Sequence, residues 1–308
     1  MAYDIIGDVH GHADRLEALL AKMGYQDRSG AWRHPSRTAI FVGDLIDRGD
    51  HQVRTLRIVR AMLDAGSARA TMGNHEFNAI AWATPHPEFS RDHLRTRQGE
   101  KGKKNRHQHQ AFLTDVGEDT PEHRSWVEWM LDLPVWIEES EFRVVHACWS
   151  PKQVHVIRPH LRDGHRLTSD LVAQASRKGS DMYHAVETLL KGEEVALPDG
   201  VSFEDKDGHV RREIRTKWWD ASLTTYRDAC IGLSPDEVPD NNIIDRERIP
   251  EPDRPTFVGH YWLSPKSPMA PRSPRVACVD YSAGRGGPLA AYRFDGEPEL
   301  TADKFIAA

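Results

Sequence analysis

Three short segments, each placed after an apolar run, constrain this chain more than any other feature. They are Gly7-Asp8-Val9-His10-Gly11, Gly43-Asp44-Leu45-Ile46-Asp47-Arg48-Gly49 and Gly73-Asn74-His75-Glu76. The preceding runs, residues 3–7, 38–42 and 68–72, predict strands, and helical spacing follows at 12–23 and 53–63. This alternation predicts a parallel sheet with helices packed on it, which is an α/β fold.

The side chains of these segments are expected at one edge of the sheet, because ligand sites form at the carboxyl ends of parallel strands. Asp8 and His10 are two residues apart, a spacing that in an extended chain points both side chains the same way. Asp44 could give one carboxylate oxygen to each of two metal ions, and Asn74 offers a carbonyl oxygen. Divalent metals bind such oxygen and nitrogen ligands. We therefore expect a site for two divalent metal ions at this edge of the sheet.

The rest of the chain continues the pattern around a less regular middle. Strand patterns occur at residues 133–138, 142–147, 256–259, 275–280 and 289–294, and helical patterns at 122–133 and near 185–190. Residues 91–109 are basic and nearly free of apolar side chains, which indicates an exposed loop. Residues 150–254 are rich in charge and proline. We interpret them as an insertion, or cap, within a single domain that spans residues 1–308.

Taken together, the three segments resemble the motifs of calcineurin-like metallophosphoesterases. The narrower resemblance is to the phosphoprotein-phosphatase branch, which includes bacterial diadenosine tetraphosphate hydrolases and protein phosphatases. Two later histidines match that branch, His146 in Val-Val-His-Ala and His260 in Val-Gly-His-Tyr, as does the closing segment 278–289. The resemblance implies a four-layer α/β/β/α sandwich, in which two mixed sheets are covered by helices.

The resemblance also implies a ligand set. The first metal would be held by Asp8, His10 and Asp44, and the second by Asp44, Asn74, His146 and His260. Trp262 stands where many relatives outside this branch have a further histidine, and it cannot ligate. Manganese is the metal we expect first, while iron, zinc and cobalt tolerate the same ligands.

The expected reaction is hydrolysis of a phosphoester by a metal-activated hydroxide. Arg48 presents a planar fork that suits two phosphate oxygens. His75 is expected to protonate the leaving oxygen, and Asp47 to orient His75 and raise its pKa. The catalytic set is thus His75, Asp47 and Arg48, and the set that binds substrate is Arg48, Asn74 and His75.

Other conspicuous residues favour ordinary roles. Glu76 is expected to bond to backbone rather than to metal. Trp218 and Trp219 are expected in the core of the cap rather than as a base-stacking platform. Solvent exposure is expected for His107, His109, His155, His160 and His165. A contact from the cap to the phosphate stays open for Arg211, Arg212 and Arg215.

Charge and cysteine content narrow the class further. A net charge of −6 argues against a protein that coats nucleic acid, although residues 91–109 leave open a nucleic-acid phosphodiesterase. Three widely separated cysteines, Cys148, Cys230 and Cys278, indicate reduced thiols rather than a disulfide framework. The chain shows neither a signal peptide nor an apolar run that could span a bilayer, so we expect a cytoplasmic protein.

The substrate is the least constrained part of the prediction. A phosphomonoesterase, including a protein phosphatase, is the first choice, with a small phosphorylated compound or a phosphopeptide as partner and no stable nucleic acid or membrane partner. The alternative is symmetrical cleavage of a dinucleoside polyphosphate of the Ap4A type. A non-catalytic scaffold that keeps the fold is a third hypothesis, weakened because none of the implied ligands is missing. Oligomeric state stays open.

Overall fold

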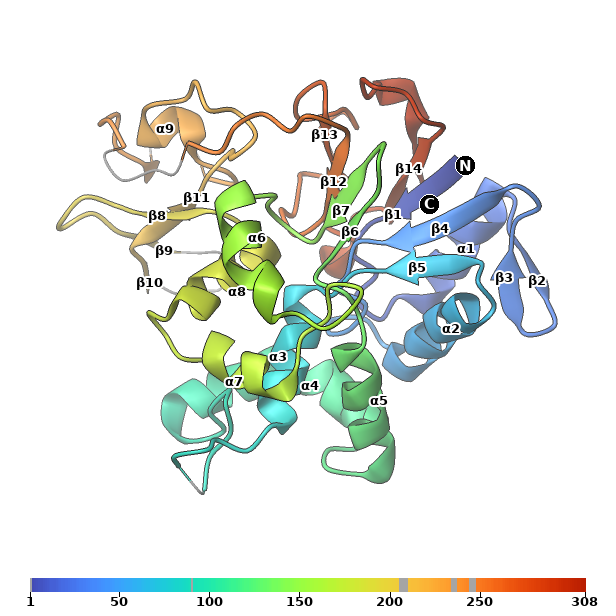
Figure 1. Ribbon diagram of the computed structural model, residues 1–308, viewed down its shortest axis with the longest axis horizontal. Coiled ribbons are helices and arrows are strands. Elements are labelled where there is room, and N and C mark those ends of the chain that lie inside the picture. Colours follow the sequence, from blue (N-terminus) through green and yellow to red (C-terminus); the bar gives the residue numbers. More distant parts are fainter. Residues whose placement is uncertain (1, 90, 205–209, 234–236, 244–247) are drawn as a thin grey trace.

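The computed structural model describes residues 2–89, 91–204, 210–233, 237–243 and 248–308, and it contains two main sheets (Figure 1). The larger sheet consists of β1 (Ala2–Ile6), β4 (Arg37–Phe41), β5 (Ala68–Ala70), β14 (Ala290–Phe294) and β15 (Phe305–Ala307). The smaller sheet consists of β6 (Trp136–Glu138), β7 (Arg143–Val145), β12 (Thr256–Val258) and β13 (Val276–Cys278). The predicted α/β class is confirmed.

Both sheets are mixed, as expected. In the larger one the order is β15-β14-β1-β4-β5, with β1, β4 and β5 parallel and β14 antiparallel to β1. In the smaller one the order is β13-β12-β7-β6, with β12 parallel to both neighbours and β6 antiparallel to β7. The predicted segments therefore follow the carboxyl ends of parallel strands in both sheets.

The two sheets pack face to face around a shared apolar core. Side chains alternate along each strand, so Ile5 and Ile40 face the other sheet while Ile6 and Phe41 belong to the cluster with the helices. The core between the sheets is formed by Ile5, Ile40, Val42, Ile137, Phe142, Val144, Phe257, Ala277, Val279, Tyr292, Phe294 and Leu300. Strands buried on both faces explain the uninterrupted apolar runs in the sequence.

Helices complete the layers. In the first half they are α1 (Ala13–Met23), α2 (Gln52–Asp64), α3 (Asn74–Ala83), α4 (Gly99–Val116) and α5 (Pro121–Leu131). α1 buries Leu16, Leu19 and Leu20 at helical spacing and ends at Gly24, whose φ of 96° suits glycine. Sequence patterns predicted α1, α2 and α5, but not the hairpin of β2 (Gln26–Arg28) and β3 (Ala31–Arg33).

The prediction of an exposed loop over residues 91–109 is wrong for its second half. Residues from Gly99 onward form α4, which buries Asn105, His109 and Phe112 at spacings of three and four. The first turns of this helix bury small and polar side chains, so the apolar stripe appears only beyond residue 109. A window that ends at 109 therefore hides the helix.

The segment between β7 and β12 has its own small elements. They are α6 (Pro151–Ile157), η1 (Arg158–His160), α7 (Ser169–Ala175), α8 (Asp181–Lys191), β8 (Glu194–Ala196), β9 (Phe203–Glu204), β10 (Val210–Arg211), β11 (Glu213–Arg215) and α9 (Tyr226–Ala229). Their interpretation as a cap stays a prediction. Trp218 and Trp219 are buried as predicted, and the Trp218 indole donates to the carbonyl of Ala147 at 3.1 Å.

Two further sequence expectations concern thiols and membranes. Cys148, Cys230 and Cys278 are buried, with no disulfide among them. Among the helices of the described residues, none is both long and apolar enough to cross a bilayer.

Candidate active site

All six predicted metal ligands are buried at the strand ends where the two sheets meet. The exposed fraction is 8% or less for each of Asp8, His10, Asp44, Asn74, His146 and His260. Four of them follow β1, β4 and β5 of the larger sheet, and the two later histidines follow β7 and β12 of the smaller sheet. The site is thus assembled from both sheets.

The backbone around the site adopts conformations that most residues avoid. His10, Asp44 and His260 have φ values of 49°, 51° and 69°. Such left-handed backbone is costly for residues other than glycine and concentrates at functional sites. It also overturns the expected reason for pairing Asp8 with His10, because β1 ends at Ile6 and the chain at His10 is not extended.

Two glycines make room for the carboxylates of Asp8 and Asp44, which are predicted ligands. A Cβ on Gly259 would lie 2.0 Å from Oδ1 of Asp8, and one on Gly73 would lie 2.2 Å from Oδ1 of Asp44. Both separations are far below van der Waals contact, so larger residues would displace the carboxylates. This close approach explains why glycine stands at both positions.

One group of possible ligand atoms comes from His10, Asp44 and His75, which lie within 4.8 Å of one another. The Nδ1–H of His10 donates to the carbonyl of Ile46 at 2.8 Å, which turns Nε2 toward Oδ2 of Asp44, 3.8 Å away. His75 stands in this group where Asp8 was expected. Asp8 lies nearby and accepts the backbone N–H of His260 at 3.0 Å through Oδ2.

A second group comes from Asp44, His146 and His260, whose ligand atoms also lie within 4.8 Å of one another. The Nδ1–H of His146 donates to the carbonyl of Val42 at 2.8 Å, and its Nε2 lies 3.3 Å from Oδ2 of Asp44. Oδ1 of Asn74 lies 3.1 Å from Nε2 of His146 and 2.8 Å from Nδ1 of His260. Asp44 therefore belongs to both groups, as a bridging ligand must.

The donor set fits divalent metal ions. Oδ1 of Asp8, Nε2 of His10 and Nε2 of His260 are buried, and no hydrogen-bond partner for them occurs in the described part of the chain. Unpartnered buried polar atoms are costly, so three at one place call for a ligand. Mixed imidazole and carboxylate ligands suit manganese, iron, zinc and cobalt alike.

Burial and neighbouring charges have opposite effects on the pKa values of Asp44 and His146. Burial alone would raise the pKa of Asp44, but the imidazoles of His146, His75 and His10 outweigh it and lower the pKa. Burial would lower the pKa of His146, yet Asp44 and Asp8 raise it to about 10. For His10, burial and the neighbouring His75 lower the pKa to about 4, which favours the neutral, ligating form at neutral pH.

A second carboxylate, Asp47, accepts a hydrogen bond from the ring nitrogen of His75 that points away from the site. The Nδ1–H of His75 donates to Oδ2 of Asp47 at 2.7 Å, so Nε2 is directed to the site. Burial would lower the pKa of His75, but Asp44 and the hydrogen bond to Asp47 raise it. Arg48 follows in the chain with a φ of 106°, and its exposed guanidinium lies 5.6 Å from the ring centre of Trp262.

Glu76 has the structural role that the sequence suggested. Its Oε2 accepts the backbone N–H groups of Asp44 and Gly73, both at 2.9 Å. Its Oε1 accepts the N–H of Leu45 at 2.8 Å, and burial raises the pKa of Glu76 to about 6. Glu76 therefore links the segment that contains Asp44 to the segment that contains Gly73 through hydrogen bonds to the backbone of both.

The sequence analysis placed His109 in solvent, and this is wrong. His109 is only 3% exposed, and its Nδ1 lies 2.8 Å from Oδ1 and 3.0 Å from Oδ2 of Asp47. Burial would raise the pKa of Asp47, but the imidazoles of His109 and His75 lower it. The spacing of His109 to Phe112 and Val116 was the signal that could have revealed its buried position.

The remaining histidines, Trp262 and the three arginines of the middle segment differ in how far they agree with the sequence predictions. His107, His155 and His160 are exposed, as predicted, whereas His165 is half-buried and stacks on Trp136 with ring centres 4.5 Å apart. The Trp262 ring stacks on that of His10 with ring centres 5.3 Å apart, so Trp262 packs against a predicted ligand. Arg211 and Arg212 are exposed. Burial lowers the pKa of His260, and the positive charge of Arg215 lowers it further, so Arg215 lies near the site.

Comparison with known proteins agrees with this geometry. A family model described as calcineurin-like phosphoesterase matches residues 1–164. An asymmetrical bis(5'-nucleosyl)-tetraphosphatase PrpE of Halalkalibacterium halodurans is 46% identical over 76 residues, 24% of this chain and 31% of the relative. A symmetrical bis(5'-nucleosyl)-tetraphosphatase of Vibrio cholerae is 31% identical over 152 residues, 49% of this chain and 46% of the relative. The matches thus span about a third and about half of these relatives.

Among solved structures, similarity extends along the chain at low sequence identity. A putative diadenosine tetraphosphatase aligns with 100% of this chain and 92% of its own, at 16% identity and a TM-score of 0.47. A serine/threonine phosphatase from Saccharomyces cerevisiae aligns with 100% of this chain and 79% of its own, at 13% identity and a TM-score of 0.49.

Proposed function

Since this chain belongs to the calcineurin-like phosphoesterase family, we propose that it hydrolyses phosphoesters with two divalent metal ions as cofactors. The observation that carries the proposal is the place of Asp44. It is 1% exposed, it belongs to both groups of possible metal ligands, and its Oδ2 lies 3.9 Å from Nε2 of His75. A shared carboxylate beside a proton donor is the arrangement that this chemistry needs.

We assign the metal sites as the sequence suggested. Asp8, His10 and Asp44 would hold the first metal, and Asp44, Asn74, His146 and His260 the second. His75 is left out of the first set and assigned as the proton donor: its Nδ1–H bonds to Asp47, which directs Nε2 into the site. When bound, the two ions supply Lewis acidity and a water of lowered pKa. Manganese is the metal to test first.

Three residues of the chain would bind the phosphate, donate the proton and orient the proton donor. Arg48, exposed at the edge of the site, would bind two phosphate oxygens through its planar fork. Nε2 of His75 would give its proton to the leaving oxygen as the bond between phosphorus and that oxygen breaks. Asp47 would keep the His75 ring in the required tautomer and orientation.

For the substrate, a phosphomonoester, including a phosphopeptide, is the first candidate. The second is a dinucleoside polyphosphate cleaved symmetrically, and one observation favours it. The guanidinium of Arg285 lies 4.5 Å from the ring centre of Trp262, and that of Arg48 lies 5.6 Å from the same centre. Two guanidinium groups beside the same ring at the edge of the site suit neighbouring phosphates on one substrate.

The test is a substrate comparison with a matched inactive protein. The purified chain, loaded with Mn²⁺, is incubated with a phosphopeptide, para-nitrophenyl phosphate and diadenosine tetraphosphate. Release of product from any of them, lost after chelation and absent in Asp44→Asn, supports the proposal. Much faster turnover of the dinucleotide reverses our order of substrates. Failure of the fully loaded wild type on all three would favour the scaffold hypothesis.

A further inference from the structure

Asp47 lies between two histidines, although the proposed mechanism uses only one of them. Oδ2 of Asp47 accepts the Nδ1–H of His75 at 2.7 Å, and Oδ1 lies 2.8 Å from Nδ1 of His109. Asp47 is 2% exposed and His109 is 3% exposed. A carboxylate buried this far needs hydrogen bonds to both of its oxygens, and the two imidazoles provide them.

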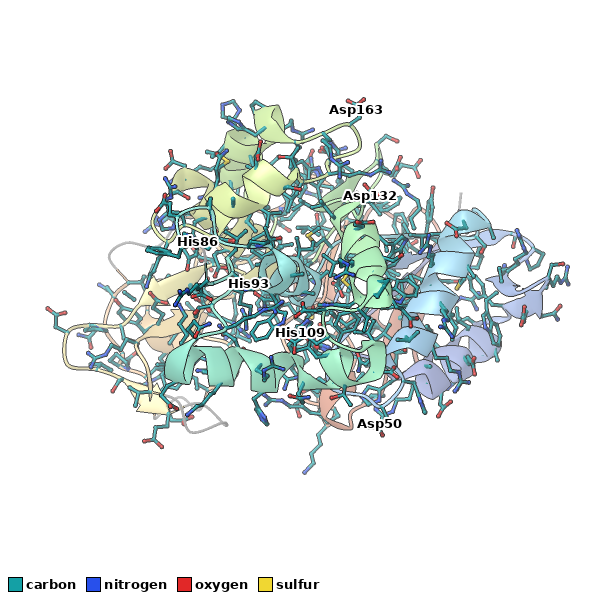
Figure 2. The ribbon with its side chains drawn as sticks, turned by 90° about the horizontal axis from the view of Figure 1, so that it is seen from below. Asp50, His86, His93, His109, Asp132 and Asp163 are labelled. Carbon is teal, nitrogen blue, oxygen red and sulfur yellow. The ribbon has the colours of Figure 1, made fainter. Side chains whose placement is uncertain are left out.

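His109 comes from α4, far in sequence from the three segments that build the site. Figure 2 labels it on the inner side of α4, toward α3. The centre of its ring lies 5.1 Å from the ring centre of Phe112 and 6.3 Å from that of Trp82. Because these aromatic neighbours flank the ring, it is held in one orientation rather than free to turn toward solvent.

Within the part of the chain that the structure describes, the hydrogen bonds of the His109 side chain are made to Asp47. Nδ1 contacts both carboxylate oxygens, at 2.8 and 3.0 Å, whereas Nε2 is buried without a hydrogen-bond partner in the described residues. A neutral imidazole has one donor and one acceptor nitrogen. Beside a carboxylate, the donor must be Nδ1, so the contact assigns the tautomer of His109.

We propose that His109 is a positioning residue for the proton donor. Its Nδ1–H anchors Oδ1 of Asp47, which leaves Oδ2 aimed at Nδ1 of His75 and thereby directs Nε2 of His75 to the leaving oxygen. This inference rests on the proposed function for its catalytic consequence, but the contact itself is independent of it. α4 would thus set the orientation of a catalytic group whose motif lies elsewhere in the chain.

Two amide substitutions separate this role from simple packing. In His109→Asn the amide nitrogen can replace Nδ1, whereas in His109→Gln it extends to the place of Nε2, which faces no partner. His109→Leu removes both nitrogens. If His109 only fills space, glutamine and leucine should be tolerated at least as well as the smaller asparagine. If it positions Asp47, asparagine should be the best of the three.

The kinetic readout is a series of aryl phosphates whose leaving groups differ in pKa. His109→Leu and His109→Gln should lower kcat by about 10- to 100-fold for poor leaving groups, with little change for good ones and with metal content kept. His109→Asn should restore most of kcat. Equal losses for all leaving groups, or rescue by glutamine rather than asparagine, would overturn the proposal.

A double-mutant cycle tests whether His109 acts through Asp47. In the Asp47→Asn background, His109→Leu should cause no further loss with poor leaving groups, because the oriented carboxylate is already gone. Independent losses that multiply would show that His109 acts by another route, and the proposal would be wrong.

A measurement without substrate separates this inference from the proposed function. In protein labelled with ¹⁵N at histidine, exchange of the Nδ1–H of His75 with solvent should be at least several-fold faster in His109→Leu than in wild type, and close to wild type in His109→Asn. Unchanged exchange in His109→Leu overturns the inference whether or not the protein hydrolyses phosphoesters. Faster exchange in a protein inert toward every phosphoester keeps the contact and rejects the proposed function instead.

Discussion

The two sheets end at the same site, but they bring different chemistry to it. The larger sheet supplies the predicted carboxylate and amide ligands and the Asp47–His75 pair, whereas the smaller sheet supplies the imidazoles of His146 and His260. The buried carboxylate of Asp280 also follows a strand of the smaller sheet, and burial together with this carboxylate raises the pKa of Asp8. Both carboxylates of the predicted ligand set thus come from the larger sheet, and the smaller sheet would complete that set. Correct spacing depends on how the two sheets pack on each other.

Each sheet has an arginine at the start of one strand that forms ion pairs with aspartate, and we call each such group a clamp. The two clamps differ in how exposed their aspartates are. In the larger sheet, Arg37 bonds at 2.8 Å to Asp4, whose side chain is fully buried. In the smaller sheet, Arg143 bonds at 3.1 Å to Glu138, whose side chain is 23% exposed, and also to Asp253, whose side chain is 60% exposed. Buried ion pairs are costly to break, whereas exposed ones contribute little. The smaller sheet should thus owe less of its stability to charge and more to apolar packing.

The largest expected effect distinguishes Asp44, the proposed bridging ligand from the larger sheet, from His260, a proposed ligand from the smaller one. Asp44→Asn should lower kcat/KM by more than about 10³-fold, because it weakens both metal sites and the charge stabilisation that depends on them. His260→Asn should weaken one site and cost about 10- to 100-fold. Metal per chain and initial rates measure both. Retention of two tightly bound metals by Asp44→Asn would contradict its place as the bridge.

The packing between the sheets gives the next effect. Phe257 of the smaller sheet lies 5.2 Å from Tyr292 and 5.4 Å from Phe294 of the larger one, measured between ring centres. Phe257→Ala should lower the free energy of unfolding by about 3–5 kcal/mol, since it leaves a cavity between the sheets. Denaturant unfolding measures this. Phe89, which is 62% exposed, is the control, and Phe89→Ala should change stability by less than about 0.5 kcal/mol.

Metal binding should hold the two sheets together. Removing metal with a chelator and restoring it at 100 times its Kd should raise the free energy of unfolding by about 2.7 kcal/mol per site. Thermal unfolding at graded Mn²⁺ concentrations checks this, with Ca²⁺ as a comparison ion. The gain should vanish in Asp44→Asn. A gain of equal size in that variant would place the stabilising ion elsewhere.

The smallest effect concerns the exposed clamp of the smaller sheet. Although burial acts in the opposite direction, Arg254 and Arg143 lower the pKa of Asp253 to about 2. A lowered carboxyl pKa stabilises the fold above the unfolded value of about 3.9, and the gain is lost as the pH falls toward 2. Asp253→Asn should therefore cost less than about 1 kcal/mol at pH 6, and this cost should shrink below pH 4.

Urea unfolding of wild type and variant at pH 6, 4 and 3 makes that comparison. Asp163→Asn, at an exposed aspartate in the same half of the chain, serves as a control for the loss of one negative charge. A cost of Asp253→Asn that stays constant across this range would show that the clamp contributes packing rather than charge.

Local patterns predicted the frame of the site well. The strands before Asp8, Asp44 and Asn74 lie where apolar runs indicated, because strands buried on both faces need such runs. Glu76 bonds to backbone as expected. The strand-alternation argument for pairing Asp8 with His10 failed, because the strand ends at Ile6 and the backbone is left-handed at His10.

The sequence by itself determined the α/β order and the placement of the proposed ligands after apolar strands, since these follow from periodicity and from short motifs. Only the tertiary structure decided that His109 contacts Asp47 and that Trp262 packs on His10. These contacts join residues far apart in the chain, and the spacing of His109 to Phe112 and Val116 indicates burial without indicating which residue His109 contacts. Their positions depend on the packing of whole helices and sheets, which acts over the entire chain rather than within a motif.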